Sequence, residues 1–101
     1  MELNEVVSQL KSEPKLFIRF HAKWCGVCKL IAPFVNKLQD DERFKDVKFL
    51  DIDVDESPDV KQAFKINNLP YFAAFKDGKL VEEFFTSKKD KIESTLEEVA
   101  A

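Results

Sequence analysis

Two cysteines, Cys25 and Cys28, are separated by two residues and are the only cysteines in the chain. A pair at this spacing can exchange disulfides, because one thiolate attacks a disulfide and the other resolves the mixed disulfide that forms. The segment from Trp24 to Lys29 lies where a buried strand is expected to end and a helix to begin. Backbone N–H groups of a first helical turn favour a thiolate on Cys25, and Lys23 and Lys29 add positive potential.

Hydrophobic periodicity predicts the elements that must hold this pair. Apolar residues at helical spacing predict a helix over residues 3–10 that stops before Pro14. Residues 15–22 are almost all apolar or aromatic, which is typical of a strand buried on both faces of a sheet. Helical spacing returns after Cys28 and continues to about Asp40. The predicted chemistry therefore lies at a strand-to-helix turn.

The rest of the chain predicts a strand, a short helix, a β-hairpin and a last helix. Their expected ranges are 47–54, 58–64, 71–75, 80–85 and 88–99. Ser57 and Ser87 are the expected N-caps of the two helices, and Asp77-Gly78 is a strong hairpin signal. This order predicts an α/β fold in which helices cover both faces of a mixed central sheet.

Length and composition limit the classes of protein that remain. The 101 residues, 45% hydrophobic and 35% charged, suit one compact domain over residues 1–101 that needs no disulfide to hold its core. The formal charge of −3, with both signs interspersed, is typical of a soluble monomer and argues against binding to nucleic acid. The sequence shows neither a secretory signal nor an apolar run near the ~18 residues of a membrane span, so we expect a cytoplasmic protein.

The chain resembles the thioredoxin family over nearly its whole length. The matching features are Phe20 and Ala22 before Trp24-Cys25-Gly26-Val27-Cys28-Lys29, Pro33, Asp53-Val54-Asp55, Leu69-Pro70 and Phe75-Lys76-Asp77-Gly78. The resemblance implies a thioredoxin fold and a protein-disulfide reductase without a cofactor, with Cys25 as nucleophile and Cys28 as resolving thiol. Its implied partners are client proteins that contain disulfides and a thioredoxin reductase or an equivalent electron donor.

The same resemblance implies a substrate-docking rim around Cys25. The residues that would form it are Trp24, Gly26, Val27, Leu69, Pro70 and Tyr71. In the family, the proline that matches Pro70 is cis and packs against the cysteines. Tyr71 and Thr86 stand where threonine and glycine are common, which adds bulk to the rim and predicts a narrower range of clients.

Two further departures from the family pattern affect the fold and the chemistry. Thioredoxins usually begin with a strand, whereas here the first helix begins at once, so we expect four strands and a changed sheet edge. Val27 replaces the usual proline between the cysteines and restores a backbone N–H near the sulfur. This donor stabilises the thiolate, so we expect a somewhat less reducing pair.

The most unusual departure is Arg19, which stands where the family has a buried Asp that assists proton transfer to or from the resolving cysteine. Asp51 stands where bacterial thioredoxins carry the lysine partner of that Asp. We expect Arg19 and Asp51 to face each other across neighbouring strands below the cysteines, each neutralising the other's buried charge. Asp51 would then accept the proton. In the alternative, Arg19 extends its charged end toward solvent and only its stem is buried.

Other interpretations of the cysteine pair predict different properties. His21, Cys25 and Cys28 offer three zinc ligands, but a closed structural site usually takes four, so we expect no metal and a packing role for His21. A redox-gated binding module would keep its activity without the thiols. An oxidase or isomerase would have a much higher reduction potential.

Overall fold

The computed structural model describes residues 1–101 as a four-stranded sheet with helices on both faces. The helices are α1 (Leu3–Ser12), α2 (Gly26–Gln39), α3 (Pro58–Ala63) and α4 (Lys89–Ala100), with a 3-10 helix, η1 (Glu42–Phe44), after α2. The strands are β1 (Lys15–His21), β2 (Lys48–Asp53), β3 (Tyr71–Lys76) and β4 (Lys79–Phe85). These elements confirm the predicted order and the four-stranded mixed sheet.

The strand order is β2-β1-β3-β4, so β1 is an inner strand and β2 forms an edge. β1 runs parallel to β2 and antiparallel to β3, and β4 returns antiparallel to β3. The inner position of β1 explains why its sequence is apolar on both faces. In the register of β1 and β2, Arg19 lies opposite Asp51.

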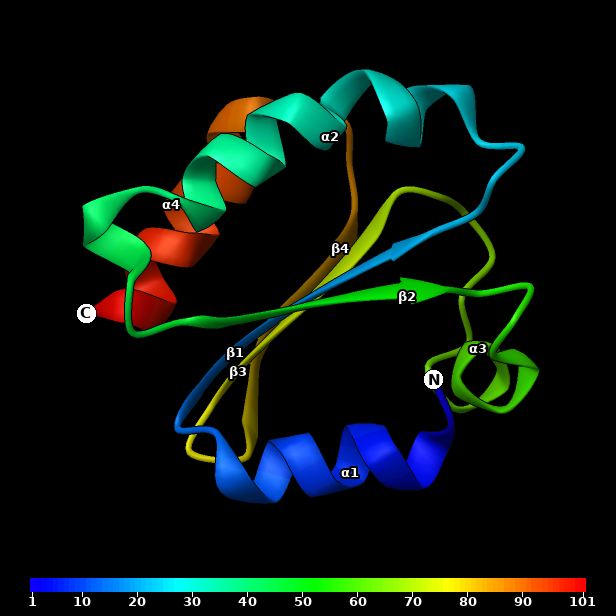
Figure 1. Cartoon of the computed structure of the whole chain (residues 1–101), viewed down its shortest axis with the longest axis horizontal. Helices are drawn as coiled ribbons and strands as arrows, with labels where there is room; N and C mark the ends of the chain where they lie inside the picture. Colours follow the sequence, from blue (N-terminus) through cyan, green and yellow to red (C-terminus); the bar gives the residue numbers. More distant parts are fainter.

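Two apolar clusters hold the helices against the sheet. Figure 1 shows α2 and α4 on one face and α1 and α3 on the other. Because side chains alternate along a strand, neighbouring residues of β1 serve different clusters. Phe17 packs on the α2 and α4 side and Phe20 on the α1 and α3 side. Cys25 and Cys28 belong to the same cluster as Phe20, so the pair is anchored in the core.

Local details at the element ends differ from the predictions in two places. The N-cap of α4 is Lys88, not Ser87, and the Lys88 N–H donates to Thr86 Oγ1 at 3.1 Å. Ser57 precedes α3 as expected, but its side chain makes no capping bond to that helix. The hairpin turn has Asp77 and Gly78 at positive φ, as an Asp-Gly turn requires. None of the helices has both the length and the apolar character needed to cross a membrane.

The central position of Phe17 predicts that its substitution strongly lowers the stability of the fold. Its ring is fully buried and packs against Phe49 and Phe72. We expect Phe17→Ala to lower the free energy of unfolding by about 3–5 kcal/mol. The matched control is Phe85→Ala, because Phe85 is exposed, and its expected cost is below about 1 kcal/mol. Urea unfolding followed by far-UV circular dichroism measures both, and equal losses would contradict the core assignment.

Candidate active site

The cysteine pair lies between the end of β1 and the start of α2. The Cys25 N–H donates to the Ala22 carbonyl at 3.1 Å, which closes the turn, and the Cys25 carbonyl accepts from the Lys29 N–H at 3.3 Å. Cys25 is thus the N-cap of α2, and Cys28 follows within the first turn. A disulfide joins the two sulfurs.

The first turn of α2 places a backbone donor on the Cys25 sulfur. The Cys28 N–H donates to Cys25 Sγ at 3.2 Å. The N-terminus of a helix carries partial positive charge, and a thiolate there gains both this field and the hydrogen bond. The sequence-based expectation that Cys25 sits at a strand-to-helix turn is confirmed, and the arrangement favours ionised Cys25 when the disulfide is open.

The pair is buried, but the residues beside it are exposed. Trp24 is 69% exposed and Val27 is 42% exposed. Large apolar side chains left open to solvent next to a buried reactive pair are typical of a surface that binds another protein. Gly26 has open space around the position of a Cβ atom, so the backbone is approachable there.

Trp24 is held in its exposed position by the loop after β2. Its Nε1 donates to Asp55 Oδ2 at 2.8 Å. That loop is itself ordered by Asp53, whose Oδ1 accepts from the Asp55 N–H at 2.9 Å, and by the Val54 N–H, which donates to the His21 carbonyl. Trp24 is exposed, in keeping with the docking rim that the resemblance implied, whereas nothing in the sequence pattern indicated the role of Asp55.

The opposite side of the rim is formed by the segment that enters β3. The Leu69–Pro70 peptide is cis, as the resemblance implied. Leu69 and Tyr71 pack against the cluster that contains both cysteines, and Leu69 also lines a small hollow together with Trp24. The Thr86 N–H donates to the Pro70 carbonyl at 3.3 Å, which places Thr86 beside the rim.

Tyr71 stays neutral at ordinary pH. Burial raises the pKa of its phenol above the usual value, and hydrogen bonding and charge from Glu83 raise it further. The Tyr71 side chain is therefore uncharged there.

Arg19 and Asp51 face each other as predicted. Arg19 Nε donates to Asp51 Oδ1 at 2.6 Å and Nη2 donates to Asp51 Oδ2 at 2.8 Å. Nη2 also donates to Asn36 Oδ1 on α2 at 3.3 Å, a contact that sequence reasoning missed. The spacing could have indicated it, because Asn36 follows Cys28 by eight residues and lies on the same helix face.

The exposure of this pair differs from the prediction. The Arg19 side chain is 11% exposed, whereas that of Asp51 is 49% exposed. The arginine is therefore largely shielded from water, whereas the carboxylate is not. The physical reason is that β2 is the edge strand, so no further strand covers the carboxylate. The alternative in which Arg19 extends into solvent is wrong.

The arginine–aspartate pair borders a cavity of about 220 Å³ that Cys28 also lines. Its lining residues are Arg19, His21, Cys28, Lys29, Ala32 and Asp51. His21, expected to be a packing residue, is half-buried and contributes to this wall. The cavity thus brings Cys28 and the arginine–aspartate pair into one space. No three His, Cys, Asp or Glu side chains are placed so that together they could hold a metal ion.

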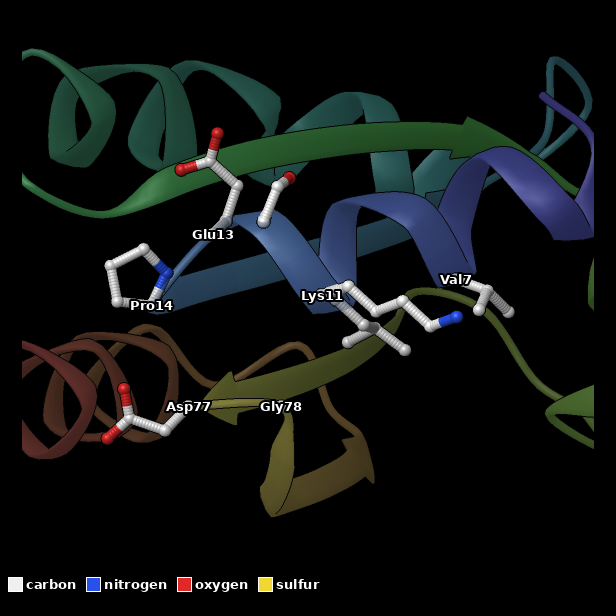
Figure 2. Close-up of a pocket in the computed structure, with 8 residues that line it drawn as sticks. Val7, Lys11, Glu13, Pro14, Asp77 and Gly78 are labelled. Carbon is white, nitrogen blue, oxygen red and sulfur yellow. The ribbon is translucent and has the colours of Figure 1, made fainter.

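The largest hollow of the molecule lies elsewhere. Figure 2 shows it between the end of α1 and the β3–β4 turn, with a volume of about 640 Å³. Lys11, Glu13 and Asp77 are its charged residues. It adjoins the start of β1, whereas the cysteines follow the end of that strand, and neither cysteine lines it.

The known proteins that are similar to this chain in sequence and in fold are thioredoxins. The family model described as "Thioredoxin" matches residues 2–98. Thioredoxin from Gallus gallus is 40% identical over 96 residues, which cover 93% of this chain and 90% of the chicken protein. Thioredoxin H2 from Arabidopsis thaliana is 37% identical over 93% of this chain and 70% of its own length.

Solved structures agree with the sequence comparison. Oxidised mitochondrial thioredoxin 3 from Saccharomyces cerevisiae superposes with a TM-score of 0.90 at 34% identity, covering 96% of this chain and 90% of the yeast chain. Together with the Cys25–Cys28 pair at the N-terminus of α2, these matches establish the activity as thiol–disulfide oxidoreduction, that of a protein-disulfide oxidoreductase. The chain belongs to the thioredoxin family.

Proposed function

We propose that this protein reduces disulfides of client proteins, with Cys25 as the nucleophile and Cys28 as the resolving thiol. The observation that carries the assignment is the Cys28 N–H donated to Cys25 Sγ, because it favours the thiolate on Cys25. The Cys25 thiolate attacks one client sulfur, and the other client sulfur leaves as a thiolate. The Cys28 thiolate then attacks Cys25 Sγ and releases the second client thiolate. Two electrons pass to the client, and an electron donor such as a thioredoxin reductase reopens the Cys25–Cys28 disulfide.

The apolar rim is the proposed docking surface for the client. It consists of Trp24, Gly26, Val27, Leu69, Pro70 and Tyr71. The exposure of Trp24 and Val27 and the open space at Gly26 support it. A similar chain, at a TM-score of 0.89 and 33% identity, comes from work on the thiol resolving mechanism of yeast mitochondrial 1-Cys peroxiredoxin via glutathione/thioredoxin systems. That neighbour supports a client with an oxidised cysteine near its surface.

Asp51 is the proposed acceptor of the Cys28 proton, held in place by Arg19. The shared cavity and the half-exposed position of Asp51 support this role, because a proton that reaches the carboxylate can pass on to water.

The proposed setting is the cytoplasm, with the protein acting as a single-domain monomer free of nucleic acid and membranes. The net charge of −3 with interspersed signs supports a freely diffusing partner of many proteins.

Cysteine variants test the assignment of the two thiols. We expect Cys25→Ser to abolish reduction of a protein disulfide such as that of insulin in the presence of dithiothreitol. We expect Cys28→Ser to complete only the first step and to accumulate a mixed disulfide, which mass spectrometry detects as a covalent adduct. Because the chain has no other cysteine, that adduct identifies Cys25 as the nucleophile. An adduct in Cys25→Ser instead would reverse the roles. A Cys25→Ser, Cys28→Ser double variant that keeps the biological activity of the protein without reducing disulfides would favour a binding module.

Substitution of Val27 tests the expected shift in reduction potential. Proline at this position removes one N–H from the first turn of α2, a contribution of about 1 kcal/mol to the thiolate. We expect Val27→Pro to make the pair more reducing by roughly 20 mV. Equilibration with a glutathione series, followed by the fluorescence of Trp24, measures the potential. A potential that stays the same or rises would show that the Val27 N–H does not stabilise the thiolate.

Neutralising Asp51 tests the proton acceptor. We expect Asp51→Asn to slow release of the second client thiolate several-fold at about pH 6, where more of the thiol is protonated, and to leave the first step unchanged. Stopped-flow measurement of both steps separates them. Asp46→Asn, a change at another exposed carboxylate, is the matched control. An equal effect in both variants would remove Asp51 from the mechanism.

A further inference from the structure

Arg19 retains an unused hydrogen-bond donor inside the protein. Its Nε and Nη2 are bonded to Asp51 and Asn36, but Nη1 is buried without any partner. Buried polar groups without partners are rare, and each calls for a reason. An arginine is always charged, so this atom carries part of a full positive charge into the interior.

The charged end of Arg19 lies next to the face of α2 that carries Cys28. Cys28, Ala32 and Asn36 follow one another at intervals of four residues, so they share one face of α2. Arg19 contacts Asn36 directly and lines the same cavity as Ala32 and Cys28. The guanidinium and Cys28 therefore border the same cavity.

The other charged groups around the cavity weaken this field but do not cancel it. Asp51 carries the opposite charge, yet its side chain is about half exposed, so water screens it more than it screens Arg19. Lys29 is exposed and adds a screened positive charge. His21 is half-buried and lies in the wall of the same cavity. The best-shielded charge facing Cys28 is that of Arg19.

We propose that Arg19 stabilises the thiolate of Cys28 and so prepares the resolving step. This inference rests on the proposed function, in which Cys28 attacks the mixed disulfide. The Cys28 thiol loses its proton to Asp51 or water, and the thiolate attacks Cys25 Sγ. The Cys28–Cys25 bond forms, the bond from Cys25 to the client breaks, and the client sulfur leaves with the electron pair. Arg19 touches no reacting atom and acts as a positioning residue through its charge.

The experiment measures the pKa of Cys28 in the Cys25→Ser protein. This background leaves one thiol, and it leaves position 25 uncharged, as in the mixed disulfide. The rate of alkylation by iodoacetamide as a function of pH gives the pKa. We expect a value below the ordinary thiol value of about 8.5 with Arg19 in place.

Charge substitutions then assign the effect to Arg19. We expect Arg19→Gln to raise the pKa of Cys28 by about one unit and Arg19→Lys to retain most of the lowering. Lysine keeps the charge but not the two-pronged bond to Asp51, so rescue by lysine separates charge from structural support. Lys29→Gln removes an exposed charge at the same cavity, and Arg43→Gln removes an arginine that bonds Asp41 and Glu93 instead. We expect smaller shifts in both.

Three results would overturn the proposal. They are a pKa of Cys28 at or above about 8.5 with Arg19 present, no rise in Arg19→Gln, or an equal rise in Arg43→Gln. The first of these results needs no Arg19 variant, so the proposal can be contradicted even if the Arg19 variants misfold. The titration of Cys28 does not depend on a client, so its result is independent of the proposed function. The proposed function itself would fail if the unmodified protein did not reduce disulfides.

Discussion

The hydrogen bond from the Cys28 N–H to Cys25 Sγ, at the N-terminus of α2, is the interaction on which the site depends. The first turn of a helix stabilises a thiolate toward which it points, and the Cys28 N–H at 3.2 Å from Cys25 Sγ provides that arrangement. To hold the turn still, β1 must be an inner strand, and it is buried between β2 and β3. The Ala22 carbonyl then closes the loop between strand and helix. The core therefore positions the N-terminus of α2 against the Cys25 sulfur.

A rigid frame also explains why the rim can remain apolar and exposed. Trp24 is not free to fold back over the cysteines, because its indole is bonded to Asp55 and that loop is tied to the end of β1 by Val54 and His21. On the other side, Thr86 is bonded to Pro70. A preformed surface loses little conformational entropy when a client binds, so its exposed apolar area is available for binding.

Local periodicity predicted the elements, whereas the resemblance to the family predicted the Arg19–Asp51 pairing. An arginine stands where the family has an acid and an aspartate where bacterial members have its lysine partner, so the two charges are exchanged and can still neutralise each other. The exposure of Asp51 was not predictable in the same way, since it depends on which strand ends the sheet. Asp55 was missed because a bond to an indole has no characteristic spacing, whereas Asn36 lies two helical turns from Cys28 and was within reach. The N-cap error at Ser87 concerns a single residue, where neighbouring polar side chains compete.

The proposed roles of Val27 and Arg19 concern the same chemical species, a thiolate. Val27 provides an N–H that a proline would lack, and Arg19 provides a cation where the family has an acid. In the proposed mechanism both groups stabilise thiolate relative to disulfide, which raises the reduction potential and lowers the driving force for reducing a client. The same proposal gives each thiol a larger ionised fraction, which speeds attack and resolution. We therefore propose that the protein suits clients whose disulfides are themselves readily reduced.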